Sequence, residues 1–228
     1  MKTYAIIPSA GRGIRAGTNS PKQYHLFNSK EMIVYTLETF QNCPLIDEII
    51  IAADKEYFHL LEKLKEKYNL DKITKIVEGG NERQHSVSNA LFSIDADTND
   101  LIAVHDAARA LLPENVLENA INSAKKFDNV VVAINARDTL IKGNDKVTDY
   151  IDRNEVYYAQ TPQIFRYGII TEALKRANED GFIGTDESMI VKRAGFDVHF
   201  VQGSSLNFKI TSTDDIKLFE MISQSKKM

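Results

Sequence analysis

The chain has 228 residues, of which 43% are hydrophobic and 26% charged, as is usual for a soluble globular protein. This length suffices for one α/β domain, and the net charge of −4 gives no general affinity for nucleic acid. The single cysteine excludes an internal disulfide or a cysteine zinc cluster, and no apolar run reaches the length of a membrane span or a signal peptide. We therefore expect one cytoplasmic domain, residues 1–228, with neither nucleic acid nor membrane among its partners.

The first predicted element is a short buried strand at residues 4–7, and a loop rich in small residues follows it. Such residues permit sharp turns and let a ligand approach backbone N–H groups, so the loop is suited to an anion. Pro21 interrupts any early helix, and the same loop supplies two cations, Arg15 and Lys22. This combination favours a polyphosphate ligand. The small residues are Ser9, Ala10, Gly11 and Gly13.

A glycine-rich turn after a strand is weak evidence alone, and a second interpretation competes here. Residues 11–16 fit the loose dinucleotide fingerprint G-x-G-x-x-G/A, which would indicate a nicotinamide-dependent dehydrogenase. That fingerprint requires a helix at once and an acid about twenty residues later, whereas Pro21 intervenes and Asp54 lies about forty residues on. The P-loop ATPase pattern is absent. A nucleotidyltransferase loop is therefore the better interpretation.

Strand and helix patterns alternate along the rest of the chain. Apolar runs predict strands at residues 48–53, 73–77, 101–104, 130–134 and 198–201. Helical spacing predicts helices at residues 32–40, 55–68, 87–94, 113–127, 167–179, 187–193 and 212–222. Repeated βαβ units form parallel sheets with right-handed crossovers, so we expect an α/β fold with a mostly parallel, twisted sheet.

Two further motifs follow predicted strands. Residues 78–87 contain a glycine pair before a helix, which a capped helix start would explain on its own. Residues 101–109 place His105 and Asp106 at the carboxyl end of a strand, where α/β proteins bind ligands. Asp106 is suited to coordinating a metal or accepting hydrogen bonds from ligand hydroxyls, although an acid that caps the next turn is an alternative.

The pattern changes between residues 137 and 160. Two short alternating runs flank Gly143-Asn144-Asp145, which predicts a β-hairpin. A hairpin alone is marginal in water, so it needs a surface to pack on, and a two-fold mate is the commonest partner. We therefore expect residues 137–160 to form an arm that joins two subunits of a homodimer.

Residues 10–15 together with Pro21-Lys22-Gln23 resemble the signature of the sugar-phosphate cytidylyltransferases. Later motifs agree in order, at residues 79–87, 105–109, 161–163 and 207–211. The residue identities Arg83-x-x-Ser86-Val87 and Ala107-Ala108-Arg109 favour the enzymes that act on 2-C-methyl-D-erythritol 4-phosphate over those that act on ribitol 5-phosphate. Many members carry an acid where this chain has Asn81, and proline where it has Ala110.

The resemblance implies a three-layer, Rossmann-like nucleotidyltransferase fold with a protruding β-hairpin arm. It implies that CMP passes from CTP to the sugar phosphate with release of pyrophosphate, with Mg²⁺ as cofactor, in the non-mevalonate isoprenoid pathway. The alternatives from other classes are a nicotinamide-dependent dehydrogenase and a non-catalytic regulator that binds CTP.

The resemblance also implies roles for individual residues. Arg15 and Lys22 would be catalytic, because they would stabilise the charge that develops on the triphosphate. The metal would be bound by Asp106. CTP would be bound by Ser9, Ala10, Gly11, Gly13, Gly80, Asn81, Arg83, Ser86, Asp106 and Ala107. The sugar phosphate would be bound by Arg109, Thr139, Arg153, Thr161 and Lys209, with Thr139 and Arg153 reaching in from the arm of the other subunit.

Overall fold

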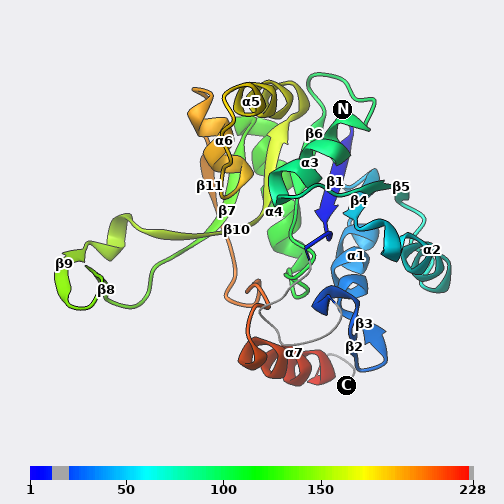
Figure 1. Cartoon of the computed structure of the whole chain (residues 1–228), viewed down its shortest axis with the longest axis horizontal. Coiled ribbons are helices and arrows are strands. Elements are labelled where there is room, and N and C mark those ends of the chain that lie inside the picture. Colours follow the sequence, from blue (N-terminus) through cyan, green and yellow to red (C-terminus); the bar gives the residue numbers. More distant parts are fainter. Residues whose placement is uncertain (12–20, 226–228) are drawn as a thin grey trace.

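The computed structural model describes residues 1–11 and 21–225, which form a layered α/β fold with one projecting hairpin (Figure 1). The strands are β1 (Thr3–Pro8), β2 (Leu26–Phe27), β3 (Lys30–Glu31), β4 (Glu48–Ala53), β5 (Ile73–Glu78), β6 (Leu101–Val104), β7 (Val130–Asn135), β8 (Leu140–Gly143), β9 (Val147–Ile151), β10 (Tyr157–Arg166) and β11 (His199–Gln202). The α-helices are α1 (Met32–Asn42), α2 (Phe58–Lys67), α3 (Arg83–Phe92), α4 (Glu114–Phe127), α5 (Tyr167–Glu179), α6 (Glu187–Arg193) and α7 (Thr213–Ser225). Short 3₁₀ turns are η2 (Lys22–Tyr24), η3 (Lys55–Tyr57) and η4 (Arg153–Glu155).

The central sheet has the strand order β11-β7-β10-β6-β1-β4-β5. Strand β10 runs antiparallel to both of its neighbours, β6 and β7, and the other pairs in this sheet are parallel. The prediction of a mostly parallel sheet is confirmed. Because β1, β4, β5 and β6 run in the same direction, their carboxyl ends meet at one edge of the sheet.

Alternate residues of each central strand face opposite helical layers. In β1, Ala5 and Ile7 join a core that includes α1, α2 and α4, whereas Tyr4 and Ile6 join a core that includes α3, α5 and α6. These strands are apolar on both faces because both faces are covered by helices. The resulting arrangement is the expected three-layer fold (Figure 1).

Periodicity did not predict η2 or the β2–β3 hairpin, since elements of two or three residues are too short for a periodic signal. Asn28 and Ser29 turn this hairpin with positive φ angles of 51° and 65°, values typical of tight hairpin turns. Phe27 packs edge-on against Phe219 of α7, with 5.2 Å between ring centroids. This small cluster fixes the C-terminal helix beside the segment that carries Lys22.

Strands β8 and β9 pair with each other and project away from the central sheet (Figure 1). The hairpin lies where the alternating pattern placed it, and its turn contains Asn144 and Asp145. Large apolar side chains on it face solvent: Ile141 is 60% exposed and Tyr150 is 67% exposed. Among the helices described here, none is long and apolar enough to cross a membrane.

Candidate active site

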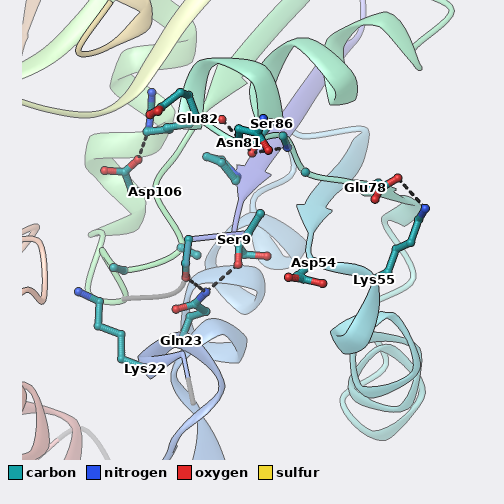
Figure 2. Close-up of a pocket in the computed structure, with 18 of the residues that line it drawn as sticks. Ser9, Lys22, Gln23, Asp54, Lys55, Glu78, Asn81, Glu82, Ser86 and Asp106 are labelled. Carbon is teal, nitrogen blue, oxygen red and sulfur yellow. Dashed lines mark hydrogen bonds and ion pairs between the residues drawn. The ribbon is translucent and has the colours of Figure 1, made fainter. Parts of the chain in front are cut away.

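A cleft of about 650 Å³ lies at the carboxyl edge of β1, β4, β5 and β6 (Figure 2). This volume is typical of small-molecule sites. Lys22 and Asp106 lie on one side of it, and an ion pair between Lys55 and Glu78, 2.8 Å long, lies on the other (Figure 2). The lining includes residues 8–11, 78–83 and 106–108, together with Ser86 and Lys209. Sequence motifs that are far apart along the chain thus meet in one cleft.

The loop after β1 is fixed by the residues that follow Lys22. Nε2 of Gln23 donates to the carbonyl oxygen of Ser9 at 2.6 Å and to that of Gly11 at 2.9 Å. The hydroxyl of Tyr24 lies 3.1 Å from Oγ of Ser9, and its ring stacks on Tyr57. Gln23 was part of the matched motif, but its role as a brace could not be predicted because it depends on contacts with the loop backbone.

The glycine pair after β5 is required by close approach between two loops. A Cβ atom on Gly79 would lie only 2.3 Å from the Cβ of Ala10, so a larger residue would push the two loops apart. The N–H of Gly80 donates to Oγ of Ser86 at 3.0 Å, and that hydroxyl donates to the carbonyl oxygen of Glu82 at 3.2 Å. Ser86 therefore fixes the position of the Gly80-Asn81 backbone.

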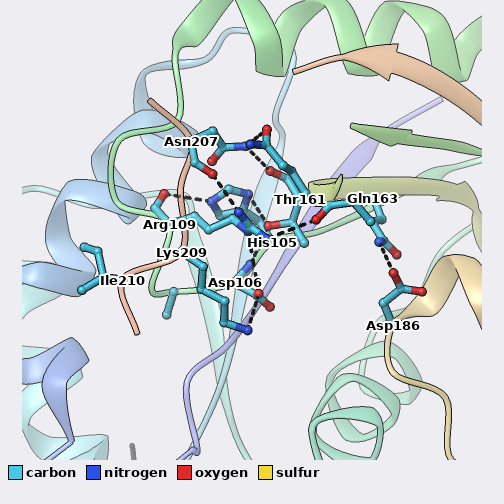
Figure 3. A network of polar contacts seen from close by, with 12 residues as sticks. His105, Asp106, Arg109, Thr161, Gln163, Asp186, Asn207, Lys209 and Ile210 are labelled. Atoms are coloured by element: carbon cyan, nitrogen blue, oxygen red, sulfur yellow. Dashed lines mark hydrogen bonds and ion pairs between the residues drawn. The ribbon is translucent and has the colours of Figure 1, made fainter. Parts of the chain in front are cut away.

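A carboxylate surrounded by cations forms the opposite wall of the cleft. Oδ1 of Asp106 accepts from Nε of Arg83 at 2.8 Å. Oδ2 lies 2.8 Å from Nζ of Lys209 and 3.9 Å from Nε of Arg109 (Figure 3). Burial alone would raise the pKa of Asp106, but Arg83, Lys209 and Arg109 together hold that pKa well below its usual range. Asp106 is therefore ionised, and it neutralises part of a cationic wall.

This arrangement does not fit a metal ion bound by Asp106, which the sequence had predicted. Both carboxylate oxygens already face cations, and those cations would repel a divalent metal. Among residues 1–11 and 21–225, no group of three or more histidine, cysteine or acidic residues is arranged to bind a metal. This arrangement therefore does not favour Asp106 as a metal ligand, and its metal role stays a prediction.

His105 and Thr161 lie behind Asp106. Oγ1 of Thr161 accepts from the N–H of Asp106 at 3.1 Å and lies 3.1 Å from Nδ1 of His105, whose Nε2 lies 3.2 Å from the carbonyl oxygen of Arg109 (Figure 3). Both side chains are buried, and burial lowers the pKa of His105 to about 4. His105 is therefore neutral, and Thr161 orients the end of β6 rather than lining the cleft.

The segment that carries Lys209 is joined to the same network. Asn207, which is buried, donates to the carbonyl oxygen of Thr161 at 2.7 Å and accepts from Arg109 at 2.8 Å through its own carbonyl oxygen. One residue after Lys209, the N–H of Ile210 donates to Ala108 at 2.9 Å, and the Ile210 carbonyl oxygen accepts a hydrogen bond from Nζ of Lys22. The two lysines thus lie at the same side of the cleft.

Some predicted site residues are not brought to this cleft. Thr139 and Arg153 lie on the exposed arm, where Nη1 of Arg153 donates to the carbonyl oxygen of Arg137 at 2.9 Å. Neither belongs to the cleft lining within one chain. Gly13 and Arg15 lie outside the residues that the structure describes.

Glu187 is joined to the site through Arg83, although its place at the start of α6 had indicated only a structural role. The acids at the start of α6 are typical of a helix N-terminus, and Asp186 indeed caps it by accepting from the N–H of Met189 at 2.9 Å. Glu187, in contrast, is fully buried and binds Nη1 of Arg83 through both oxygens, at 2.7 and 2.8 Å. No local pattern distinguishes such an acid from a solvated one.

A cleft at the carboxyl edge of a parallel sheet, with lysines facing a small-residue loop, is typical of nucleotidyltransferases with a three-layer α/β fold. Over residues 3–225 the chain matches the family model described as 2-C-methyl-D-erythritol 4-phosphate cytidylyltransferase. The chain belongs to that family. The match confirms the resemblance found in the motifs and favours the methylerythritol enzymes over the pentitol-phosphate and dehydrogenase alternatives.

Individual relatives agree with this assignment. The chain is 39% identical to a 2-C-methyl-D-erythritol 4-phosphate cytidylyltransferase of Geotalea uraniireducens, over 99% of this chain and 98% of that protein. The crystal structure of the Francisella tularensis enzyme of the same name is 30% identical, with a TM-score of 0.82 over 97% of this chain and 99% of that one. A 4-diphosphocytidyl-2C-methyl-D-erythritol synthase from Anaerococcus prevotii gives a TM-score of 0.85 at 28% identity, over 98% of each chain.

The buried, neutral His105 should make the protein less stable in acid. Its pKa is about 4 in the fold against an ordinary value of 6.5, so protons favour the unfolded chain between these values. Above pH 6.5 the imidazole is neutral in both the folded and the unfolded chain, so the unfolding free energy has its full value. As the pH falls toward 4, the imidazole is protonated only in the unfolded chain, and the unfolding free energy decreases. A shift of this size corresponds to about 3 kcal/mol.

Urea unfolding at pH 7 and near pH 4.5 measures this effect. Between the two pH values, the unfolding free energy of the wild type should fall by about 2–3 kcal/mol more than that of His105→Gln. Equal pH dependence in the two proteins would contradict the account of His105.

Proposed function

We propose that this cleft binds CTP and 2-C-methyl-D-erythritol 4-phosphate together and transfers CMP to the sugar phosphate, releasing pyrophosphate. The observation that carries this assignment is the meeting of a backbone loop, Lys22 and Lys209 at one edge of a parallel sheet, in a chain of this family. Two anionic substrates need such a concentration of positive charge, because the protein as a whole has a net charge of −4.

The reaction requires charge stabilisation more than proton transfer. A phosphate monoester has a second pKa near 6, so at neutral pH it is largely a dianion and needs no general base. The difficulty is that it attacks an α-phosphate that is also negatively charged, and charge increases there in the transition state. Lys22, together with Arg15 from the same loop, would stabilise that charge, and Lys209 would bind the phosphate of the sugar.

The nucleotide would lie between the two glycine-containing loops. Ser9, Ala10 and Gly11 would bind its phosphates, while the backbone of Gly80 and Asn81, fixed by Ser86, would bind the base. Asp106 and Ala107 would contact sugar hydroxyls, since an ionised carboxylate accepts hydrogen bonds. Arg83, Arg109 and Thr161 would act mainly by fixing Asp106, because their polar atoms already contact that residue or its neighbours.

Mg²⁺ fits this cleft as a companion of the triphosphate rather than as an ion held by the protein. Magnesium usually retains several waters and binds substrate phosphates with few protein ligands. It would neutralise phosphate charge, while the residues of this chain bind and orient the two substrates.

The arm supports a further part of the proposal, a homodimer with shared sites. Residues 137–160 expose Ile141 and Tyr150 on a hairpin that cannot be stable alone, so a covering surface is expected. A second copy of this chain would supply it, as is commonest for soluble oligomers. Thr139 and Arg153 would then bind the sugar phosphate in the partner's cleft, since they do not line the cleft of their own chain.

The substrate assignment is tested by pyrophosphate release from CTP and Mg²⁺ with each sugar phosphate in turn. Release with 2-C-methyl-D-erythritol 4-phosphate should be faster than with ribitol 5-phosphate. CTP bound without any release would instead indicate a non-catalytic regulator, and the reverse order would indicate the pentitol-phosphate enzyme.

Sharing of sites between subunits is tested by mixing Lys22→Ala and Arg153→Ala proteins. Each alone should lose about a hundredfold or more in activity, because Lys22→Ala removes a group that stabilises the developing charge and Arg153→Ala removes one that positions the sugar phosphate. Random mixing in equal amounts makes about half of the dimers mixed, each with one intact site of two, so activity should recover to about a quarter of wild type.

Tag pull-down provides the control for mixing, and Lys63→Ala, at an exposed position of α2, is the matched lysine control. Mixed dimers that form but stay inactive would place Arg153 in its own subunit's site.

A further inference from the structure

Glu187 and Asp106 are two carboxylates that share one guanidinium. Arg83 donates to Asp106 through Nε at 2.8 Å and to both oxygens of Glu187 through Nη1 at 2.7 and 2.8 Å. Asp106 lines the cleft, whereas Glu187 lies behind the cleft wall with no exposed surface. The guanidinium of Arg83 therefore connects Asp106, which faces the cleft, to the carboxylate of Glu187, which a ligand in the cleft does not reach.

Glu187 depends on Arg83 for its pairing. Within the described part of the chain, Arg83 supplies every hydrogen bond that the Glu187 carboxylate accepts. A buried carboxylate without a cation would be costly, so this pair persists whenever the chain is folded. The guanidinium is thereby kept in one orientation, with Nε directed at Asp106.

The backbone around Glu187 is itself fixed by buried glutamines. Gln163 of β10 donates to Asp186 at 2.9 Å (Figure 3). It also accepts from the N–H of Ser188 at 2.8 Å. Gln84 of α3 accepts from the N–H of Gly184 at 2.8 Å. The start of α6 is therefore attached to the core on both sides of Glu187, which makes this carboxylate the fixed point of the network.

Asp106 has a second cation that is held less firmly. The side chain of Lys209 is 43% exposed, against 27% for Arg83, and no second carboxylate within hydrogen-bond distance fixes it among the described residues. A sugar phosphate entering the cleft would draw Lys209 away from Asp106. Arg83, which is hydrogen-bonded to Asp106, and the more distant Arg109 would then keep this carboxylate ionised, and Arg83 would orient it toward the substrate.

We propose that Glu187 is a positioning residue for cytidylyl transfer, which acts by fixing Arg83 so that Asp106 stays oriented after Lys209 turns to the sugar phosphate. This inference rests on the proposed binding of both substrates in the cleft. The inference gives helix α6 a positioning role in the reaction, although no residue of α6 lines the cleft.

The test is Glu187→Gln in the full-length enzyme, assayed with CTP, Mg²⁺ and 2-C-methyl-D-erythritol 4-phosphate. The amide keeps the shape, but it loses the negative charge, and its NH2 group replaces one of the two oxygens that accept from Arg83. We expect kcat/KM for the sugar phosphate to fall about tenfold or more, since misplacing a group by about 1 Å can cost about a hundredfold. The loss should appear in kcat/KM for both substrates, because the proposed complex places Asp106 against the nucleotide sugar, whereas the loop after β1 is held by Gln23 and should keep its binding of the phosphates.

The matched control is Asp197→Asn, which removes the charge of an exposed acid that pairs with Lys192 of α6 at 2.8 Å. Asp197 contacts neither Arg83 nor the glutamines that fix the start of α6, so this variant should keep wild-type kinetics. A loss in Asp197→Asn equal to that in Glu187→Gln would attribute the effect to α6 as a whole and overturn the proposal.

Arg83→Lys tests whether Arg83 must bridge Glu187 and Asp106, and it does so even if Glu187→Gln does not fold. Lysine still pairs with Glu187, but an ammonium cannot bridge both carboxylates with a fixed fork, so the same loss is expected in a folded protein. In the background of Arg83→Gln, adding Glu187→Gln should cause no further loss, because Glu187 acts through Arg83.

Additive losses in that double variant, or wild-type kcat/KM in either Glu187→Gln or Arg83→Lys, would overturn the inference. A wild-type enzyme that released no pyrophosphate would instead contradict the proposed function, so the two failures are distinguishable.

Discussion

A buried carboxylate stays ionised only where cations surround it, and the site of this protein is organised by that requirement at Asp106. Arg83 comes from the start of α3, Arg109 from the turn after β6, and Lys209 from the segment before α7. Three segments that are distant in sequence are thus brought to one point. The charge of Asp106 also limits their mutual repulsion, so several cations remain together before any anionic substrate arrives.

The parallel sheet makes this convergence possible. Its strands β1, β4, β5 and β6 end at the same edge, which places the first loop, the glycine pair and Asp106 around one cleft. Each loop is then fixed by neutral hydrogen bonds: Gln23 to the first loop and Thr161 to the end of β6. A site that carries out phosphoryl chemistry by orientation and charge benefits from such rigidity, because its groups must be in place before the reaction begins.

The sequence predicted the layers of the fold well because periodicity reports burial, and strands covered on both faces are nearly continuous apolar runs. It also identified the loops of the cleft, since glycines such as Gly79 are needed where two backbones approach closely. It did not predict contacts between distant segments. The brace formed by Gln23, the internal position of Thr161 and the pairing of Glu187 with Arg83 all depend on tertiary geometry that local patterns do not contain. The metal role expected for Asp106 stays a prediction that its surroundings do not favour, because spacing could not show how many cations surround it.

The ionisation of Asp106 is the claim on which this account depends most directly, and carboxyl ¹³C NMR of aspartate-labelled protein measures it. The resonance, assigned by its loss in Asp106→Asn, should keep the chemical shift of an ionised carboxylate throughout the pH range in which the protein stays folded. Arg83, Lys209 and Arg109 hold the pKa of Asp106 well below its ordinary value of 3.8, against the effect of burial. A resonance that titrates at or above that value would show that the surrounding cations do not determine the state of Asp106, and would contradict the account.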